Sequence, residues 1–315
     1  MAVYTRISAT DLTQYLSLFD IGTLVSFEGI TDGVENTNYC LTTTQGRFIL
    51  TLFEKRVCEE DLPFFISFMN YLRDKGIPCP GVIAAKTGTT VIPFNKKPAI
   101  ITTFLQGQWP QHLESFHGDA VGTTLAKMHL TGKNFSMRRA NSVSLPLWRD
   151  LIDKCGDRAS QLEQGLFTLL QQELSYQEKN WPQHLPTGAV HADLFPDNVF
   201  FTGQEITGVI DFYFSCTESF AYDLMLTVNA WCFDETGQLD NHMFSEMLEA
   251  YQKKRPLTAS ELKALPFFGR AAALRIIATR LYDWLHPVPG AVVKMKDPVE
   301  YVRILQFYQT GDLPI

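Results

Sequence analysis

A short hairpin pattern in the second half of the sequence constrains the fold more than any other feature. An apolar run at residues 199–201 is followed by the turn sequence Thr-Gly-Gln-Glu and by a returning run at residues 206–210. Two such runs around a turn that contains Gly predict a pair of antiparallel strands. Because pairing brings the start of the first strand beside the end of the second, Asn198 and Asp211 are expected to lie side by side.

The polar residues at this end of the hairpin are suited to phosphate chemistry. The carboxylate of Asp211 and the amide oxygen of Asn198 are hard ligands of the kind that hold Mg²⁺ with its phosphates. Asp193 lies one loop upstream and is therefore available to accept a proton from a hydroxyl nucleophile. Asp and Asn also favour turns, so each residue alone has a purely structural explanation. The spacing of all three around the hairpin favours a phosphoryl-transfer site.

The same residues carry a family resemblance. The order His191-x-Asp193-x-x-x-x-Asn198, followed by a hairpin and Asp211, resembles the aminoglycoside phosphotransferase and choline kinase superfamily, without the Arg that protein kinases have after the His. Three segments are more specifically similar to the homoserine kinases of that superfamily, namely residues 191–199, 210–213 and 223–232.

The resemblance implies an α+β, bilobal protein-kinase-like fold with ATP in the cleft. A small antiparallel-sheet lobe for the nucleotide is expected at residues 1–105, and a larger, mainly helical lobe with the catalytic loop and substrate pocket at residues 106–315. Sequence periodicity predicts strands at residues 24–30, 38–43, 47–53, 82–85, 89–93 and 98–105. It predicts helices at residues 8–19, 59–75, 116–130, about 151–180, 225–232 and 266–284.

The resemblance also implies cofactors and roles. ATP and Mg²⁺ are expected, with the Mg²⁺ held by Asn198 and Asp211. Asp193 is expected to orient the acceptor hydroxyl and take its proton, and His191 to fix the loop by hydrogen bonding. The implied acceptor is the side-chain hydroxyl of L-homoserine, which gives O-phospho-L-homoserine on the route to threonine. Choline, a thiosugar or an aminoglycoside stays open as the acceptor, and so does a nucleotide-binding pseudokinase.

The residues expected to bind the nucleotide depart from the family pattern in one place. Thr51 stands where the superfamily usually has a Lys or Arg against the α- and β-phosphates, and its hydroxyl offers a hydrogen bond without charge. Lys55, of the same strand parity, or Arg47 is the candidate replacement, with an ordinary surface Lys as the alternative for Lys55. Thr103 and Leu105 lie in a segment that resembles the kinase hinge, whose backbone reads the adenine edge. A buried strand is the alternative for that segment.

A zwitterionic amino acid needs one anionic and one cationic partner. Asp197 is the candidate for its ammonium group and Arg275 for its carboxylate. Arg275 lies in an apolar helical stretch and needs an anion, which is either a protein carboxylate or the carboxylate of the substrate. Tyr213, Asn229 and Trp231 are candidate walls of the pocket.

Three other polar residues are expected to be structural. Asp223 lies just inside a predicted helix, where it supports the catalytic loop or satisfies helix amides. His117 and His129 are not spaced as a metal pair and are expected to be surface or capping groups.

The charge, the cysteines and the signature motifs of the whole sequence argue against several classes of protein. With 27 Lys and Arg against 34 Asp and Glu among 315 residues, the net charge of −7 argues against a nucleic-acid binder. The six cysteines are scattered, as in reduced cytosolic proteins, and the sequence contains no Walker, dinucleotide or hydrolase signature. Neither a signal peptide nor an uninterrupted apolar span is visible. A cytoplasmic enzyme with a small-molecule partner is therefore expected, away from membranes and nucleic acid, and its oligomeric state stays unknown.

Overall fold

The computed structural model describes residues 5–30, 36–54, 57–287, 296–311 and 313–315. The chain divides into two compact units, one of residues 1–106 with 289–294 and the other of residues 107–288 with 295–315. The main division follows Gln106, where the sequence placed a boundary after residue 105. None of the described helices is long and apolar enough to cross a membrane.

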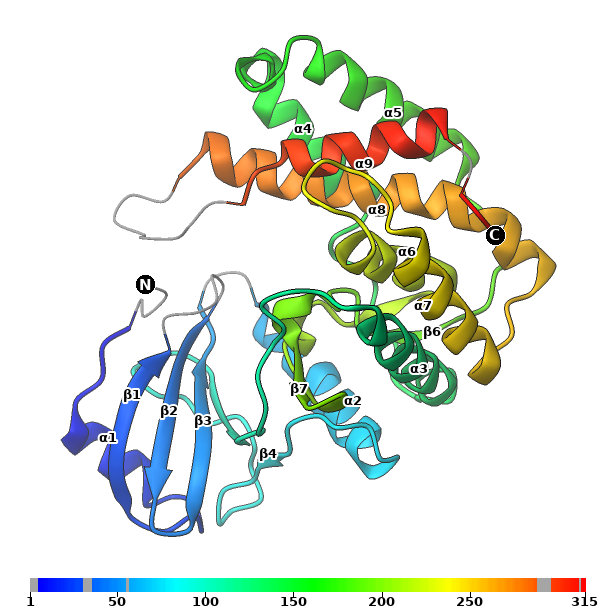
Figure 1. Cartoon of the computed structure of the whole chain (residues 1–315). Helices are drawn as coiled ribbons and strands as arrows, with labels where there is room; N and C mark the ends of the chain where they lie inside the picture. The colour runs from blue at the N-terminus through cyan, green and yellow to red at the C-terminus, as the bar shows by residue number, and fades with distance from the viewer. Residues whose placement is uncertain (1–4, 31–35, 55–56, 288–295, 312) are drawn as a thin grey trace. The chain divides into compact units, whose positions relative to one another are not determined.

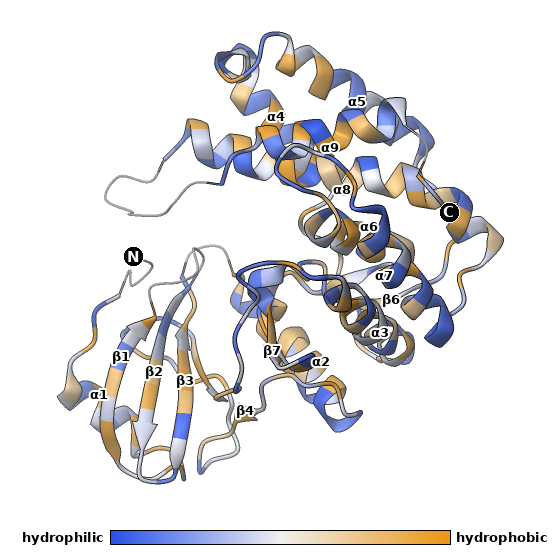
Figure 2. Cartoon of the chain, in the orientation of Figure 1, coloured by the Kyte–Doolittle hydropathy of each residue, from blue (hydrophilic) through white to orange (hydrophobic). Residues whose placement is uncertain are grey.

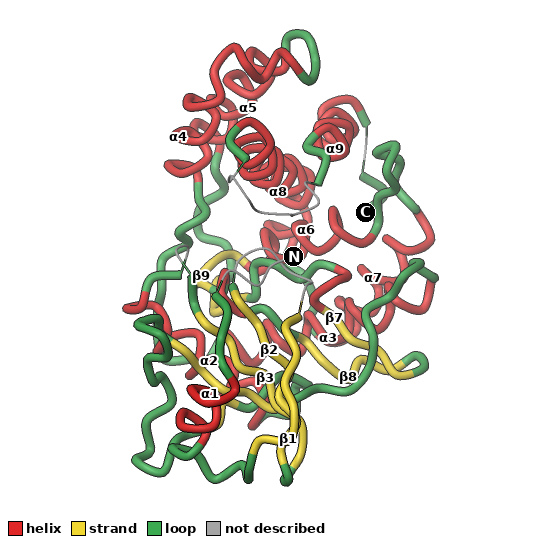
Figure 3. The backbone as a smooth tube through the Cα atoms, turned by 90° about the vertical axis from the view of Figure 1, so that its left-hand side faces the viewer, coloured by secondary structure: helices red, strands yellow, loops and turns green. Residues whose placement is uncertain are grey.

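The first unit is built on a five-stranded antiparallel sheet of order β1-β2-β3-β5-β4 (Figures 1 and 3). Its strands are β1 (Leu24–Ile30), β2 (Thr37–Thr43), β3 (Gly46–Leu52), β4 (Val82–Ile83) and β5 (Ala99–Thr103). A tight turn joins β2 to β3 and ends at Gly46, whose φ of 139° is a conformation that side chains disfavour. Leu50 and Leu52 of the central strand β3 are fully buried, because they belong to the apolar core of this unit.

Two helical segments complete this unit. Ser8 begins α1 (Ala9–Leu16) by accepting a hydrogen bond from the Asp11 N–H. The apolar side of α1 packs into one core with the sheet, and apolar residues colour much of the strands in Figure 2. A 3₁₀ turn, η1 (Glu59–Asp61), leads into α2 (Leu62–Asp74), with Pro63 in the first turn where its missing N–H breaks no helical bond.

One expected strand is wrong. Residues 89–93 do not form a strand, and β4 is shorter than the predicted 82–85. After β4 the chain turns, with the Ala85 N–H donating to the Thr89 carbonyl at 2.8 Å. Ile92 makes one backbone bond to the Ala99 carbonyl, at 3.0 Å, but Pro93 has no N–H with which to continue a ladder.

The second unit is mainly helical (Figure 3). Its helices are α3 (Ser115–Gly132), α4 (Leu145–Cys155), η2 (Gly156–Gln161), α5 (Leu166–Asn180), α6 (Phe220–Trp231), α7 (Asn241–Lys254), α8 (Ala259–Leu285) and α9 (Val299–Thr310). The region predicted as helical at about 151–180 is divided at Gly156 and Gly165, both of which have positive φ. α8 begins well before the predicted residue 266, because Thr258 and Glu261 form a capping box.

Two nested ladders position the loops of interest. β6 (Thr187–Val190) pairs with β9 (Cys216–Ser219), and between them in sequence β7 (Val199–Thr202) pairs with β8 (Glu205–Val209). Each of the two connections, from β6 to β7 and from β8 to β9, therefore runs between the same two ladders. This topology places residues 191–198 and 210–215 next to each other, and the predicted hairpin is confirmed.

Candidate active site

The two adjacent loops are joined by backbone and side-chain bonds. The Ile210 N–H donates to the Asn198 carbonyl at 3.0 Å, which extends the β7–β8 ladder by one bond. The Asp211 backbone then turns into the left-handed region, with φ of 64°, which Asp tolerates better than most residues. The chain reverses into a 3₁₀ turn, η4 (Phe212–Phe214), and returns to β9. Asn198 and Asp211 thus lie at one end of the hairpin, as their positions in the sequence predicted.

Asn198 also organises Asp193. Its Nδ2 donates to the Asp193 carbonyl at 2.8 Å and lies 3.4 Å from Oδ2 of the same residue. Since the amide nitrogen is used in this way, the amide oxygen is the atom left to bind a cation. The side chain of Asp193 is 18% exposed, so its carboxylate is partly accessible.

His191 ties one loop to the other from a buried position. Its Nε2 donates to the Ile210 carbonyl at 3.0 Å, and its Nδ1 accepts from the Asp193 N–H at 3.2 Å. These two bonds require the neutral ring with the proton on Nε2. Burial lowers the pKa of His191 to about 4, which keeps that neutral form at physiological pH. The predicted role of His191 in fixing the loop agrees with these contacts.

The backbone between these residues is strained and held from both sides. Ala192 has φ of 62°, a conformation that costs a non-Gly residue about 1–2 kcal/mol. Its N–H donates to Oδ1 of Asp223 at 2.8 Å, and its carbonyl accepts from Nη1 of Arg275 at 2.5 Å. Asp223 therefore supports the loop, as expected from its place at the start of a helix.

A buried chain of hydrogen bonds continues behind Asp223. Nη1 of Arg255 donates to the Tyr251 hydroxyl at 3.1 Å, and this hydroxyl lies 2.7 Å from Nδ1 of His129. Nε2 of His129 lies 2.9 Å from Oδ2 of Asp223. Because the ionised carboxylate of Asp223 only accepts, the Nε2–H of the neutral His129 ring donates to it, and Nδ1 accepts from the Tyr251 hydroxyl, which in turn accepts from Arg255.

The expectation that His129 is a surface or capping group is therefore wrong. The side chain is fully buried, and it contacts an element 94 residues further along the chain. Burial lowers the pKa of His129 by more than Asp223 raises it, so the ring is neutral. Burial raises the pKa of Asp223, but the hydrogen bond from His129, nearby charges and the Ala192 amide outweigh it and keep the carboxylate ionised. His117, in contrast, does cap a helix, in a reciprocal box with Glu114.

The residues predicted to contact the substrate divide into two groups. Asp197 is half exposed and pairs with Lys296 at 3.0 Å, and Tyr213 is partly exposed on η4. Asn229 and Trp231 are buried, and their polar groups bind within the protein. The Asn229 amide donates to the Gly269 carbonyl and accepts from a tyrosine hydroxyl, and the Trp231 indole donates to the Leu194 carbonyl at 2.8 Å.

Asn229 and Trp231 are therefore internal groups of the helical unit, and of the two only Trp231 bonds to the loop of Asp193, which corrects their prediction as pocket walls. Arg275 is also buried and has a protein partner. Of the two anions that the sequence left open, the structure supplies the protein carboxylate, with Nη2 of Arg275 3.5 Å from Oδ1 of Asp193. Its side chain is only 3% exposed.

In the first unit, the predicted nucleotide residues are also engaged. The Thr51 hydroxyl donates to Oδ1 of Asn38 at 2.7 Å, across the pair that they form in the sheet. The Thr103 N–H donates to the Gly81 carbonyl and its hydroxyl accepts from the Gly81 N–H, both at 2.9 Å. Leu105 lies beyond the end of β5 and makes no backbone hydrogen bond to another described residue. Lys55 lies outside the described residues.

Arg47 lies at the other end of β3 from Thr51. Its guanidinium stacks on the Phe104 ring, with 3.8 Å between the Cζ atom and the ring centroid. Nη2 also lies 3.2 Å from the Cys40 sulfur. The guanidinium thus rests on the residue that follows β5 directly.

The oxygen donors of the two loops fit a phosphate-bound divalent cation. Asp211 carries a carboxylate and Asn198 an amide oxygen, and the two residues lie on neighbouring backbone segments at the end of the hairpin. No group of three or more His, Cys, Asp or Glu side chains is placed to hold a metal among the described residues. A site with two protein oxygens suits Mg²⁺, which keeps several waters and takes its other ligands from substrate phosphates.

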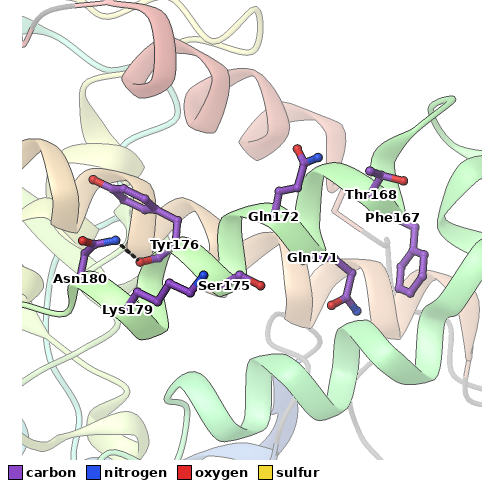
Figure 4. A pocket seen from close by; sticks show the side chains of 8 residues that line it. All are labelled: Phe167, Thr168, Gln171, Gln172, Ser175, Tyr176, Lys179 and Asn180. Atoms are coloured by element: carbon purple, nitrogen blue, oxygen red, sulfur yellow. Dashed lines mark hydrogen bonds between the residues drawn. The ribbon is translucent and has the colours of Figure 1, made fainter.

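A hollow of the described surface lies elsewhere. It has a volume of about 560 Å³ and runs along α5, where eight side chains line it (Figure 4). Figure 4 shows Tyr176, Lys179 and Asn180 at one end and Phe167 at the other. None of the predicted site residues lines it, so it belongs to the surface of the helical region and not to the two loops.

Comparisons with known proteins agree with this geometry. A model of a family described as "Phosphotransferase enzyme family" matches residues 26–257. The curated homoserine kinase of Rhodopseudomonas palustris is 50% identical over 310 residues, which cover 98% of this chain and 95% of that protein. The homoserine kinase of Brucella anthropi is 48% identical over 309 residues, with the same coverage.

Solved structures share the fold at much lower identity. Amicoumacin kinase in complex with AMP-PNP, Ca²⁺ and Ami has a TM-score of 0.74 at 16% identity, covering 96% of this chain and 92% of that one. Choline kinase from Cryptosporidium parvum has a TM-score of 0.62 at 14% identity, covering 90% and 88%. The α+β, protein-kinase-like fold predicted from the sequence is confirmed.

Proposed function

This chain belongs to the phosphotransferase enzyme family, and we propose that it transfers the γ-phosphoryl group of ATP to the side-chain hydroxyl of L-homoserine, giving O-phospho-L-homoserine. The observation that carries this proposal is the 50% identity to a curated homoserine kinase across 98% of the chain. The enzyme is a small-molecule kinase whose product lies on the route to threonine, and it acts in the cytoplasm.

In this proposal Asp193 is the catalytic residue. Its partly exposed carboxylate orients the homoserine hydroxyl and accepts the proton as the oxygen attacks the γ-phosphorus. The new O–P bond forms while the bond from the γ-phosphorus to the bridging oxygen breaks, and ADP leaves with that oxygen. His191 is hydrogen-bonded to the Asp193 N–H and to the Ile210 carbonyl. These two bonds keep the relative position of the two loops fixed during the transfer.

Asn198 and Asp211 would hold Mg²⁺ through their amide and carboxylate oxygens. A bound ion would supply charge neutralisation on the phosphates of the nucleotide. Asn198 has a second task, since its amide nitrogen is bound to the Asp193 carbonyl. One side chain therefore couples the position of the metal ligand to the position of the base.

We assign the remaining predicted residues as follows. The adenine edge meets the backbone of Leu105, whose N–H and C=O are unused among the described residues, and Thr103 only positions that segment through Gly81. Thr51, with Lys55, stays the proposed phosphate side of the nucleotide site. Asp197 meets the substrate ammonium and Tyr213 lines the acceptor pocket.

An acceptor panel tests the proposal. The purified chain is assayed for ADP release with ATP, Mg²⁺ and, in turn, L-homoserine, choline and an aminoglycoside. We expect L-homoserine to be preferred by at least about a hundredfold in kcat/KM, a difference of about 3 kcal/mol in transition-state binding. Absence of homoserine-dependent ADP release would remove the assignment.

A matched variant tests the role of the base. Asp193→Asn keeps the shape of the side chain but removes the proton acceptor, so turnover should fall by about 10²–10⁴-fold. ATP–Mg²⁺ binding, measured by calorimetry, should persist because Asn198 and Asp211 are unchanged. Equal turnover in the variant and the wild type would show that Asp193 is not the base.

A further inference from the structure

The guanidinium of Arg275 reaches the loop of Asp193 from a distant element. Arg275 lies in α8, where nearly every neighbouring residue is buried. Its Nη1 donates to the carbonyl of Ala192, and its Nη2 lies 3.5 Å from Oδ1 of Asp193. One rigid, planar group therefore holds both the peptide that precedes the catalytic residue and the carboxylate itself.

The backbone at Ala192 gives this contact its importance. A φ of 62° is a region that Ala leaves unless surrounding contacts hold it there. The N–H on one side of Ala192 is bound to Asp223, and the carbonyl on the other side is bound to Arg275. The two peptide groups that flank Ala192 fix the direction of the Asp193 side chain. Removing Asp223 or Arg275 releases one of these two groups.

The carboxylate of Asp193 is oriented by the same group. Oδ1 faces Arg275, and Oδ2 lies 3.4 Å from the Asn198 amide nitrogen. These two contacts oppose rotation about the side-chain bonds, while 18% of the side chain stays exposed for the acceptor. A general base gains most when it is held in one productive geometry before the substrate arrives.

A direct role for Arg275 with the substrate carboxylate conflicts with these contacts. To meet the substrate, the guanidinium would leave a buried carbonyl without a donor. Its charge is already paired with Asp193, and the Phe214 ring lies 5.5 Å from its Cζ atom. The guanidinium of Arg275 is thus already bound to protein groups and is not available to a substrate carboxylate.

We propose that Arg275 is a positioning residue, which fixes Ala192 and the Asp193 carboxylate for proton transfer and does not read the carboxylate of the substrate. The choice of acceptors in its test rests on the proposed homoserine kinase activity. Arg275→Met and Arg275→Lys are compared with wild type on L-homoserine and on 3-aminopropan-1-ol, which is homoserine without its carboxylate. Arg280→Met is the matched control, because Arg280 lies in the same helix and pairs with Glu300.

The two roles predict different kinetics. For a positioning residue, Arg275→Met lowers kcat by about 100-fold on both acceptors, leaves KM for L-homoserine within about threefold, and preserves the preference between the acceptors. Arg275→Lys recovers part of kcat, because one ammonium reaches the carbonyl but lacks the planar fork. Arg280→Met keeps the wild-type kcat. A large rise in KM for L-homoserine with kcat intact, and a lost preference for it, would overturn the proposal, as would an unchanged kcat.

A second measurement needs no substrate. Hydrogen exchange of residues 191–198, read by mass spectrometry, is expected to be faster in Arg275→Met than in wild type and in Arg280→Met. If Arg275→Met does not fold, Arg275→Lys, which retains the buried cation, takes its place. Unchanged exchange overturns the proposal even where the kinetic change is seen. A wild type without activity on L-homoserine would instead remove the proposed function, and the exchange measurement alone would then decide the role of Arg275.

Discussion

The buried imidazole of His191 makes folding of the second unit depend on pH in a defined window. Burial lowers its pKa from 6.5 to about 4, with the Asp223 charge and the Ile210 carbonyl acting in the opposite direction. Between these two values the unfolded chain binds a proton at His191 that the folded chain does not bind. The free energy of unfolding therefore falls as the pH falls through this window. A pKa difference of about 2.5 corresponds to a loss of about 3 kcal/mol.

The substitution His191→Gln isolates the contribution of His191 to the pH dependence of the free energy of unfolding. Gln is neutral in both states, and its amide can still donate to the Ile210 carbonyl. At pH 7 the variant should be less stable by about 1–3 kcal/mol, because the Asp193 N–H loses its acceptor. As the pH is lowered to about 4, the wild type should lose about 3 kcal/mol relative to the variant, so the two stabilities converge or cross. Burial also lowers the pKa of His117 and of His129, but these residues act equally in both proteins.

Urea unfolding followed by tryptophan fluorescence measures this difference selectively. All five tryptophans lie between residues 107 and 288, so the signal reports the second unit. His242→Gln, at an exposed position, is the control for removing an imidazole. If the stability gap between wild type and His191→Gln were the same at pH 7 and at pH 4.5, His191 would not be held neutral in the folded state and the reasoning would fail.

Three further predictions concern contacts around the site. Tyr251→Phe removes the hydroxyl that links Arg255 to His129, so the second unit should lose about 1–3 kcal/mol of stability in the same urea assay. Gly122→Ala places a Cβ 2.2 Å from the Met247 carbonyl oxygen, where α3 meets the backbone of α7, and should destabilise by about 1–3 kcal/mol or more, seen as a lower Tm. Asp197→Asn breaks a half-exposed ion pair, so its stability should change by less than about 1 kcal/mol, while KM for L-homoserine should rise in steady-state assays.

Local sequence signals predicted the parts of the site that depend on neighbours in the chain. The hairpin brings Asn198 and Asp211 together through a turn of a few residues, which periodicity and turn chemistry reveal. In contrast, the contact of His129 with Asp223 joins residues 94 apart, and no local pattern fixes such a distance. A His on the apolar side of a helix was the available signal, because such a side chain needs a buried partner.

For Arg275, too, the sequence predicted the burial of the side chain but not its partner. Its apolar surroundings correctly indicated a buried guanidinium that needs an anion. The anion lies 82 residues away, and only the packing of α8 beneath the loop selects it. Thr51 was singled out from its place in the strand, but its partner Asn38 follows from the register of β2 and β3, which the turn between them sets.

The loop of Asp193 is held chiefly through its carbonyls. Four consecutive carbonyls accept hydrogen bonds from side chains, three of which lie outside the loop: His191 from Ser215, Ala192 from Arg275, Asp193 from Asn198 and Leu194 from Trp231. A loop anchored in this way does not need the side chain at position 192, so Ala fits there although protein kinases have Arg. Because three of the donors lie outside the loop, the geometry of Asp193 depends on how α6, α8 and the residues after η4 pack around it. Substitutions at Trp231 or Arg275 should therefore lower kcat more than they lower the affinity for either substrate.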